Sequence, residues 1–197
     1  MTPSERATTV AANLFAVKGY SATSTRELSD ALGVTKGTFY HHFPSKEDLL
    51  VQICDESLTR ITTAALQAVE NATDSLGRLE LLVRQHVHTM LADQALHKTM
   101  LTELRSLSRP NFDRVVALRD AYSDIMEGAI GACQAEGTLE SSVDTHLLSL
   151  LLLNMLNWTI FWYHPEGAHS PDQIADACVT TFFDGWRREH PAGTRQR

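Results

Sequence analysis

The most constraining feature of the sequence is a pair of short helices that must meet at a tight turn. Ser24-Thr25-Arg26-Glu27 has the spacing of a capping box, in which the serine and the glutamate satisfy backbone donors at a helix start. That helix extends only to Gly33, because glycine is the usual residue just past a helix end. Thr35 then caps a second short helix that ends near His42. This pattern predicts a helix-turn-helix motif, whose second helix is available for the DNA major groove.

The predicted second helix has one apolar face and one polar face. Phe39 and Phe43 share a side and are expected to face the core. The remaining surface is small and polar, as contact with base edges and phosphates requires. It carries Lys36, Gly37, Thr38, Tyr40, His41 and His42.

Two lysines occupy the first helical position after a predicted cap, Lys36 after Thr35 and Lys46 after Ser45. A helix N-terminus carries roughly half a positive charge, so a cation there is mildly unfavourable. A DNA phosphate at the same place would reverse the sign of this effect. Two such lysines within one helix-turn-helix favour phosphate contact over the alternative, two solvated lysines.

The distribution of charge points to the same region. The net charge of the chain is -7, which does not suggest a nucleic-acid binder. Residues 1–50, however, hold five basic and five acidic residues, so the whole net negative charge falls in residues 51–197. Any anion-binding surface is therefore expected in the first fifty residues.

The cysteines and histidines suggest neither a disulfide framework nor a metal site. Cys54, Cys133 and Cys178 are far apart and odd in number, which fits a reduced cytoplasmic protein. The histidine spacing singles out no set of metal ligands, so we expect no metal and no cofactor.

Nearly all of the remaining chain has helical periodicity, and no segment has the two-residue period of a strand, so the predicted fold class is all-α. The run 147–163 is the one candidate for a membrane span. It has 17 residues, the lower limit for a span, and polar residues interrupt it. A buried helix is the better interpretation. The N-terminus lacks a signal-peptide pattern, so we expect a cytoplasmic chain without a membrane partner.

At this point the residues resemble a known family. The stretch AANLFAVKGYSATSTRELSDALGVTKGTFYHHFPSKEDLL is similar to the N-terminal domain of the TetR family of transcriptional repressors. The resemblance covers about residues 5–52, and the helical remainder fits the family in length and helix order. It implies a helix-turn-helix DNA-binding domain over 1–50 and a ligand-binding and dimerisation domain over 51–197.

The resemblance also implies which residues contact DNA. Phosphate contacts at the second helix would come from Thr25 and Arg26. The residues facing bases would be Thr35, Lys36, Gly37 and Thr38. The DNA backbone would be held by Tyr40, His42 and Lys46.

Family members are homodimers whose last two helices form a four-helix interface, and the residues support this independently. The segment 147–161 is too apolar to be exposed in a monomer, and the final helix carries an apolar stripe. The alternative is that both helices are internal core. The predicted interface residues are Leu151, Met155, Ile174, Cys178 and Phe182.

Family members also bind a small inducer in the larger domain. Arg119 lies in an apolar helical series and needs either an internal carboxylate or an anionic ligand. His86 also interrupts an apolar stripe, although a hydrogen-bonded core histidine is the simpler interpretation. LNWTIFWYHPEG, residues 156–167, loosely resembles regulators that respond to fatty-acyl or steroid-derived CoA thioesters. The predicted ligand contacts are His86, Arg119, Tyr122, Trp158 and Trp162.

Taken together, the sequence predicts a ligand-responsive homodimeric repressor that binds a palindromic double-stranded DNA operator. A small, mostly apolar effector, such as an acyl-CoA or a related lipid or steroid thioester, would release it. The alternatives are an enzyme that uses the C-terminal pocket and a helical adaptor whose helix-turn-helix binds protein. No nucleophile elbow, metal motif or phosphate-binding glycine loop supports the enzyme.

Overall fold

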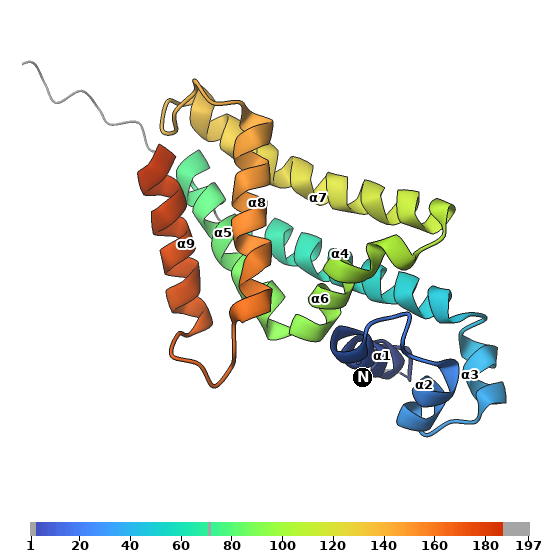
Figure 1. Ribbon diagram of the computed structural model, residues 1–197. Coiled ribbons are helices and arrows are strands. Elements are labelled where there is room, and N and C mark those ends of the chain that lie inside the picture. The colour runs from blue at the N-terminus through green and yellow to red at the C-terminus, as the bar shows by residue number, and fades with distance from the viewer. Residues whose placement is uncertain (1–2, 71, 187–197) are drawn as a thin grey trace, which may run out of the picture. The chain divides into compact units, whose positions relative to one another are not determined.

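The computed structural model describes residues 3–70 and 72–186, and within these residues the regular structure is helical (Figure 1). The prediction of an all-α fold is therefore confirmed. The helices are α1 (Pro3–Lys18), α2 (Thr25–Leu32), α3 (Lys36–His42), α4 (Lys46–Val69), α5 (Ser75–Ala92), α6 (Gln94–Glu103), the short 3-10 helix η1 (Leu104–Ser106), α7 (Arg109–Ala135), α8 (Thr145–Trp162) and α9 (Pro171–Trp186).

The predicted start and end of α2 are confirmed atom by atom. The hydroxyl of Ser24 accepts a hydrogen bond from the Glu27 N–H at 3.2 Å, and the Ser24 N–H donates to the Glu27 carboxylate at 2.8 Å. Gly33 ends the helix with φ of +70°, a left-handed conformation that glycine adopts without steric cost. The Val34 N–H then donates to the Ser29 carbonyl at 3.0 Å and closes the turn.

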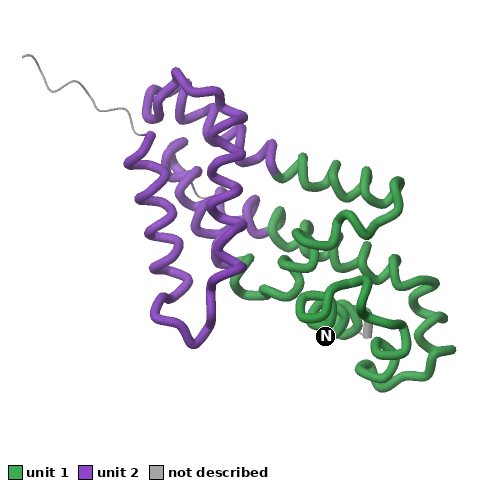
Figure 2. Tube along the Cα trace, viewed as in Figure 1, with its two compact units in different colours: residues 1–63, 89–122 green, residues 64–88, 123–197 purple. Residues whose placement is uncertain are grey.

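The chain forms two compact units, which Figure 2 shows in green and purple. Unit 1 comprises residues 1–63 and 89–122, and unit 2 comprises 64–88 and 123–197. This division differs from the predicted boundary at residue 50. Compactness does not measure whether 1–50 folds independently, so the predicted domains 1–50 and 51–197 stay a prediction.

The core of unit 1 joins the helix-turn-helix to α6. Thr99 of α6 donates a hydrogen bond to the Ala12 carbonyl of α1 at 3.1 Å within this buried contact. Because α6 completes this core, unit 1 extends beyond the first fifty residues. Its largest fully buried side chains include Phe15, Leu28, Phe39, Leu49, Leu50, Ile53 and Leu96.

A polar pair lies buried in unit 1. The Ser57 hydroxyl and Nδ1 of His97 are 2.8 Å apart, and both residues are fully buried. Burial lowers the pKa of His97 to about 4, so the ring is neutral at physiological pH. No pattern in the sequence pairs these two residues, which are 40 positions apart.

Unit 2 packs α8 and α9 with the C-terminal half of α7 and most of α5. Polar contacts link α5 to α9 on its surface: Arg84 forms an ion pair with Asp176, and Nε2 of His88 lies 3.0 Å from Oδ1 of Asp172. At the C-terminal end of α9, the Trp186 carbonyl accepts a hydrogen bond from the Glu140 N–H at 2.8 Å. Its core side chains include Leu79, Val83, Met126, Ile130, Leu148, Leu152, Leu156 and Phe183.

Helix α8 is not the buried helix that its composition suggested. Only 39% of the segment from Thr145 to Trp162 is buried, and the other side is apolar and exposed. By length and composition alone this is the one helix of the described residues that could cross a membrane, but helices that pack in soluble proteins pass the same test. The exposed members follow helical spacing and define the α8 stripe: Leu147, Leu150, Leu151, Trp158, Phe161 and Trp162.

Candidate nucleic-acid interface

Helix α3 presents the polar face that the sequence predicted. Phe39 and Phe43 are buried, and their rings lie 5.6 Å apart, centroid to centroid. Every polar position of the predicted face is exposed, from Thr35 to Thr38 and at Tyr40, His41 and His42. The helix is therefore held by its aromatic side and offers its outer side to another molecule.

The start of α3 is fixed by two threonines. The Thr35 hydroxyl caps the helix by accepting the Thr38 N–H at 3.1 Å, and the two hydroxyls lie 2.9 Å apart. Thr35 therefore has a structural role in addition to its predicted base contact. Thr38 stands one turn further along, with an exposed hydroxyl that can still accept or donate.

Polar side chains of α2 and α3 also contact each other. The Tyr40 hydroxyl donates to the Thr25 hydroxyl at 3.3 Å, and the Lys36 ammonium lies 5.8 Å from the centre of the Tyr40 ring. Arg26, on the same helix as Thr25, has a side chain that is 90% exposed and forms a long 3.9 Å ion pair with Asp30. Such a surface pair contributes at most a few tenths of a kcal/mol, so a phosphate can replace the carboxylate.

Lys46 makes hydrogen bonds within the protein that the sequence did not predict. Its ammonium group is half-buried and donates to the carbonyls of Tyr20 at 2.8 Å and Thr23 at 2.9 Å. It also lies 4.1 Å from the centre of the Tyr20 ring, and burial lowers its pKa. Two of its three donors therefore hold the turn between α1 and α2, and a phosphate contact by Lys46 stays a prediction.

Two carboxylates that the sequence analysis did not single out attach this region to the following helices of unit 1. Glu103, at the end of α6, accepts the Tyr20 N–H at 3.2 Å. Glu47 of α4 accepts hydrogen bonds from the Ser108 N–H at 2.8 Å and from the Asn111 side chain at 2.6 Å. Hydrogen bonds from Ser108 and then from Asn111 lower the pKa of Glu47. No sequence signal identifies such partners, because each pair is separated by several helices along the chain.

The predicted ligand contacts do not form one buried set. His86 and Tyr122 are buried in different units, and burial raises the pKa of Tyr122. Arg119 is exposed, so the premise that it is a buried arginine in need of an anion is wrong. Trp158 and Trp162 are 65% and 48% exposed and belong to the outward α8 stripe. The roles of these residues in effector binding stay predictions.

The predicted dimer residues also divide into two groups. Leu151 is exposed and Met155 is half-buried in the single chain. Residues that a second copy is predicted to cover should be accessible in this way. Ile174, Cys178 and Phe182 are already buried within unit 2, so these three members of the apolar stripe of α9 pack inside their own chain, whereas its Ala177 and Thr181 are exposed. In residues 3–70 and 72–186, moreover, no group of three histidine, cysteine or acidic side chains could hold a metal ion.

Comparison with known proteins decides the family. The model for bacterial regulatory proteins of the tetR family matches residues 8–53, and that for the tetracyclin repressor-like C-terminal domain matches residues 72–186, more than half of the chain. The chain belongs to the TetR family. It is a transcription regulator and not an enzyme, and the helix-turn-helix prediction is confirmed.

Three similar TetR-family proteins span nearly the whole chain. The transcriptional repressor KstR2 of Rhodococcus jostii is 28% identical over 182 residues, which are 92% of this chain and 89% of the relative. The regulator PfmR of Thermus thermophilus is 33% identical, with a TM-score of 0.84 over 93% of this chain and 100% of PfmR. AibR, solved with isovaleryl coenzyme A and operator DNA, is 26% identical, with a TM-score of 0.81 over 92% and 98% of the two chains.

Gly37→Ala should raise stability and weaken operator binding. A Cβ at Gly37 would meet only Thr35 Oγ1, at 3.8 Å, and alanine favours an exposed helix over glycine by about 0.5–1 kcal/mol. If α3 enters the major groove, the added methyl group obstructs close approach of the backbone to DNA. Urea unfolding and binding to an operator selected from random DNA measure the two effects.

The matched control is Gly128→Ala in α7, where a Cβ meets no atom within 4 Å. It should stabilise the protein similarly and leave DNA binding unchanged. A Gly37→Ala protein that is stabilised and binds its operator as tightly as the parent would remove Gly37 from the interface.

Lys46→Met and Lys36→Met should have opposite signatures. Lys46→Met leaves two turn carbonyls without their charged donor and should lower the free energy of unfolding by about 1–3 kcal/mol. Lys36→Met, at an exposed position, should leave stability unchanged. It should reduce the salt dependence of DNA binding by about one unit of log-log slope per protomer. If Lys46→Met instead flattens the salt slope at unchanged stability, Lys46 binds phosphate as the sequence suggested.

Proposed function

We propose that this TetR-family chain is a homodimeric transcriptional repressor that binds a palindromic operator and is released by a small, mostly apolar effector. The observation that carries the DNA-binding part is the exposed polar face of α3 above the buried Phe39 and Phe43. Repression is supported by the likeness to KstR2, which is named as a repressor. A regulator of this kind acts in the cytoplasm, where its DNA is.

The α8 stripe supports dimerisation. Its six large apolar side chains recur every three, four or seven residues, so they share one side of the helix. Soluble monomers rarely expose an apolar patch of this extent. Beside it lies a groove of about 220 Å³ lined by Met155, Trp162, Ala177 and Thr181 among others. A second copy supplies a matching stripe and groove by two-fold symmetry.

Two-fold symmetry has a consequence for the DNA. A dimer with one α3 per protomer reads two half-sites in opposite orientation, which is why we propose a near-palindromic operator. The spacing of the half-sites depends on the distance between the two α3 helices in the dimer.

For the effector we propose a CoA thioester with an apolar acyl or steroid group. The support is the likeness to AibR, whose structure contains isovaleryl coenzyme A. Within unit 1, Tyr122 is a buried polar side chain that suits contact with the acyl part or its carbonyl. Arg119, which is exposed, suits a charged part of the effector that stays near water.

Leu151→Asp should convert the dimer to a folded monomer. Leu151 is 48% exposed in a single chain, so a carboxylate there reaches water in a monomer but would be buried and unpaired in the dimer. Sedimentation at micromolar concentration gives the mass of each species. The matched control is Leu66→Asp in α4, at a position that is 51% exposed and outside the α8 stripe. A monomeric parent protein, or an unchanged dimer in Leu151→Asp, would contradict this interface.

CoA thioesters should release the protein from its operator, while free coenzyme A should not. An effector coupled to DNA binding by 1–3 kcal/mol changes operator affinity by about 5–150-fold. Fluorescence anisotropy with isovaleryl-CoA, longer acyl-CoAs and a steroid-CoA measures this change directly. Tyr122→Phe keeps the shape of the buried ring and should weaken the response without altering operator affinity. If thioesters of every tested class leave the operator affinity unchanged, the proposed effector class is wrong.

A further inference from the structure

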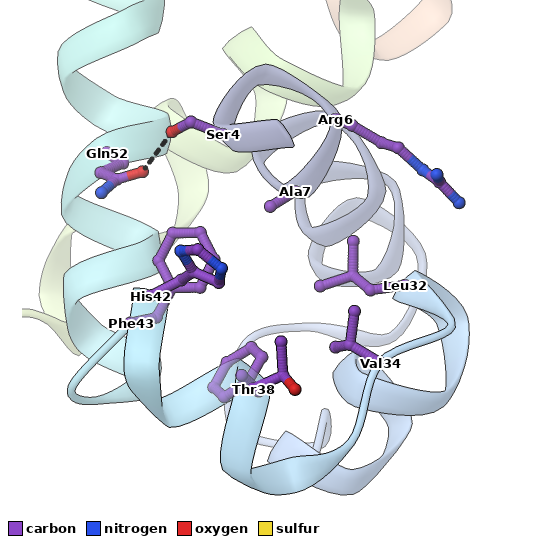
Figure 3. Close-up of a pocket in the computed structure, with 10 residues that line it drawn as sticks. Ser4, Arg6, Ala7, Leu32, Val34, Thr38, His42, Phe43 and Gln52 are labelled. Carbon is purple, nitrogen blue, oxygen red and sulfur yellow. Dashed lines mark hydrogen bonds between the residues drawn. The ribbon is translucent and has the colours of Figure 1, made fainter. Parts of the chain in front are cut away.

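A cavity of about 350 Å³ lies within the helix-turn-helix region itself, beneath the flank of α3 (Figure 3). Side chains from α1, the end of α2, the turn between α2 and α3, α3 and its C-terminal cap, and α4 surround it. Its volume is at the lower end of the range of small-molecule sites, which is about 300–1,000 Å³. The lining residues are Ser4, Arg6, Ala7, Leu32, Val34, Thr38, Phe39, His42, Phe43 and Gln52.

The cavity has an apolar floor and a polar rim. Ala7, Phe39 and Phe43 are buried and form the floor, the half-buried Leu32 lies beside them, and the exposed Val34 lines the edge. Across the rim the Ser4 hydroxyl donates to Oε1 of Gln52 at 3.4 Å, which Figure 3 shows as a dashed line between α1 and α4. That bond leaves both N–H groups of the Gln52 amide available, because only its oxygen is used.

The charge of the lining favours an anion. Among the described residues that line the cavity, Arg6 is the one charged side chain, and none is a carboxylate. In Figure 3 the guanidinium of Arg6 points away from the centre of the cavity, so it contributes positive potential at the rim. Closer contacts would come from N–H and O–H donors, those of Gln52, His42 and Thr38.

We propose that this cavity binds a small apolar carboxylate, with the hydrocarbon part on the aromatic floor and the carboxylate at the rim. This site is separate from the effector site proposed for the larger domain and does not depend on it. Charge complementarity selects an acid over a neutral or cationic molecule of the same shape, since a carboxylate gains charge-assisted hydrogen bonds that an alcohol lacks.

Occupation of the cavity has a direct consequence for DNA binding. Thr38 and His42 line the cavity and also belong to the exposed face of α3. A bound molecule contacts α1, the turn at Val34 and α3 at once, so it fixes the orientation of α3 against α1. The same two side chains are then less available to DNA, and carboxylate and operator weaken each other's binding by the same factor.

The test uses octanoate as the probe and the full-length, isotope-labelled protein, with amide NMR signals as the readout. Octanoate should shift the signals of the cavity residues. Octan-1-ol and octylamine should bind there at least about ten-fold more weakly, because they lack the carboxylate. Octanoate should also lower operator affinity measured by anisotropy.

Two variants locate the site. Ala7→Leu fills the cavity from α1 and should abolish the octanoate-induced shifts, whereas Val17→Leu adds carbon on the same helix at a position that is 85% exposed and should change nothing. If Ala7→Leu does not fold, Gln52→Leu removes the rim donors at nearly constant size and should reduce octanoate affinity about ten-fold.

The proposal fails if octanoate shifts only signals of residues in the larger domain, or if Ala7→Leu and Val17→Leu respond alike. It also fails if octanoate and octan-1-ol bind the cavity equally. None of these outcomes affects the proposed repressor function, which is tested with CoA thioesters and residues outside the cavity.

Discussion

The burial of Phe39 and Phe43 is the contact on which the DNA-reading surface depends. Helix α3 has seven residues, and an isolated helix in water is marginal below about 12–15 residues. Its conformation is therefore fixed by tertiary packing on the core of Phe15, Leu28 and Leu50, together with the Thr35 cap. Because the aromatic side supplies the stability, the outer side can carry residues that stabilise a helix poorly, such as Gly37 and Thr38.

Few cations in this region are left for DNA phosphates. Lys46 is engaged with two backbone carbonyls, and Lys18 pairs with Glu27 at 2.5 Å, which with the Ser24 hydrogen bonds lowers the pKa of Glu27 to about 2. The cations that remain are chiefly Lys36 and Arg26. In a chain with a net charge of -7, long-range attraction to DNA is weak. We therefore expect affinity to come mainly from the proposed short-range fit of α3 in the groove, which favours specific over non-specific binding.

The sequence predicted those features of the site that depend on neighbouring residues. Ser24, Gly33 and Thr35 set the ends of α2 and α3 through hydrogen bonds that span only three to five positions. Lys46 could not be placed in this way, because the carbonyls before α2 reach its ammonium group only after α1, α2 and α4 have packed. Helical periodicity shows which residues share a helix face, but it does not show whether another element covers that face. Arg119 has helical spacing to buried residues, yet it lies in a stretch of α7 that is exposed on every side. The apolar composition of α8 predicted contacts on most sides, and it could not tell which side stays exposed in a single chain.

The two carboxylates Glu103 and Glu47 give the helix-turn-helix a physical connection to the rest of unit 1. Glu103 holds the backbone N–H of Tyr20, and Lys46 holds the carbonyl of the same residue, so the turn before α2 is fixed from both sides. A displacement of the end of α6 must carry this turn with it or break a hydrogen bond to a charged group, which contributes about 1.5–3 kcal/mol. Moving the turn is the less costly response, and α2 and α3 follow because they share its core. A displacement of the end of α6 would therefore act on the turn before α2 through the Glu103–Tyr20 hydrogen bond, and on α3 through the core that these helices share.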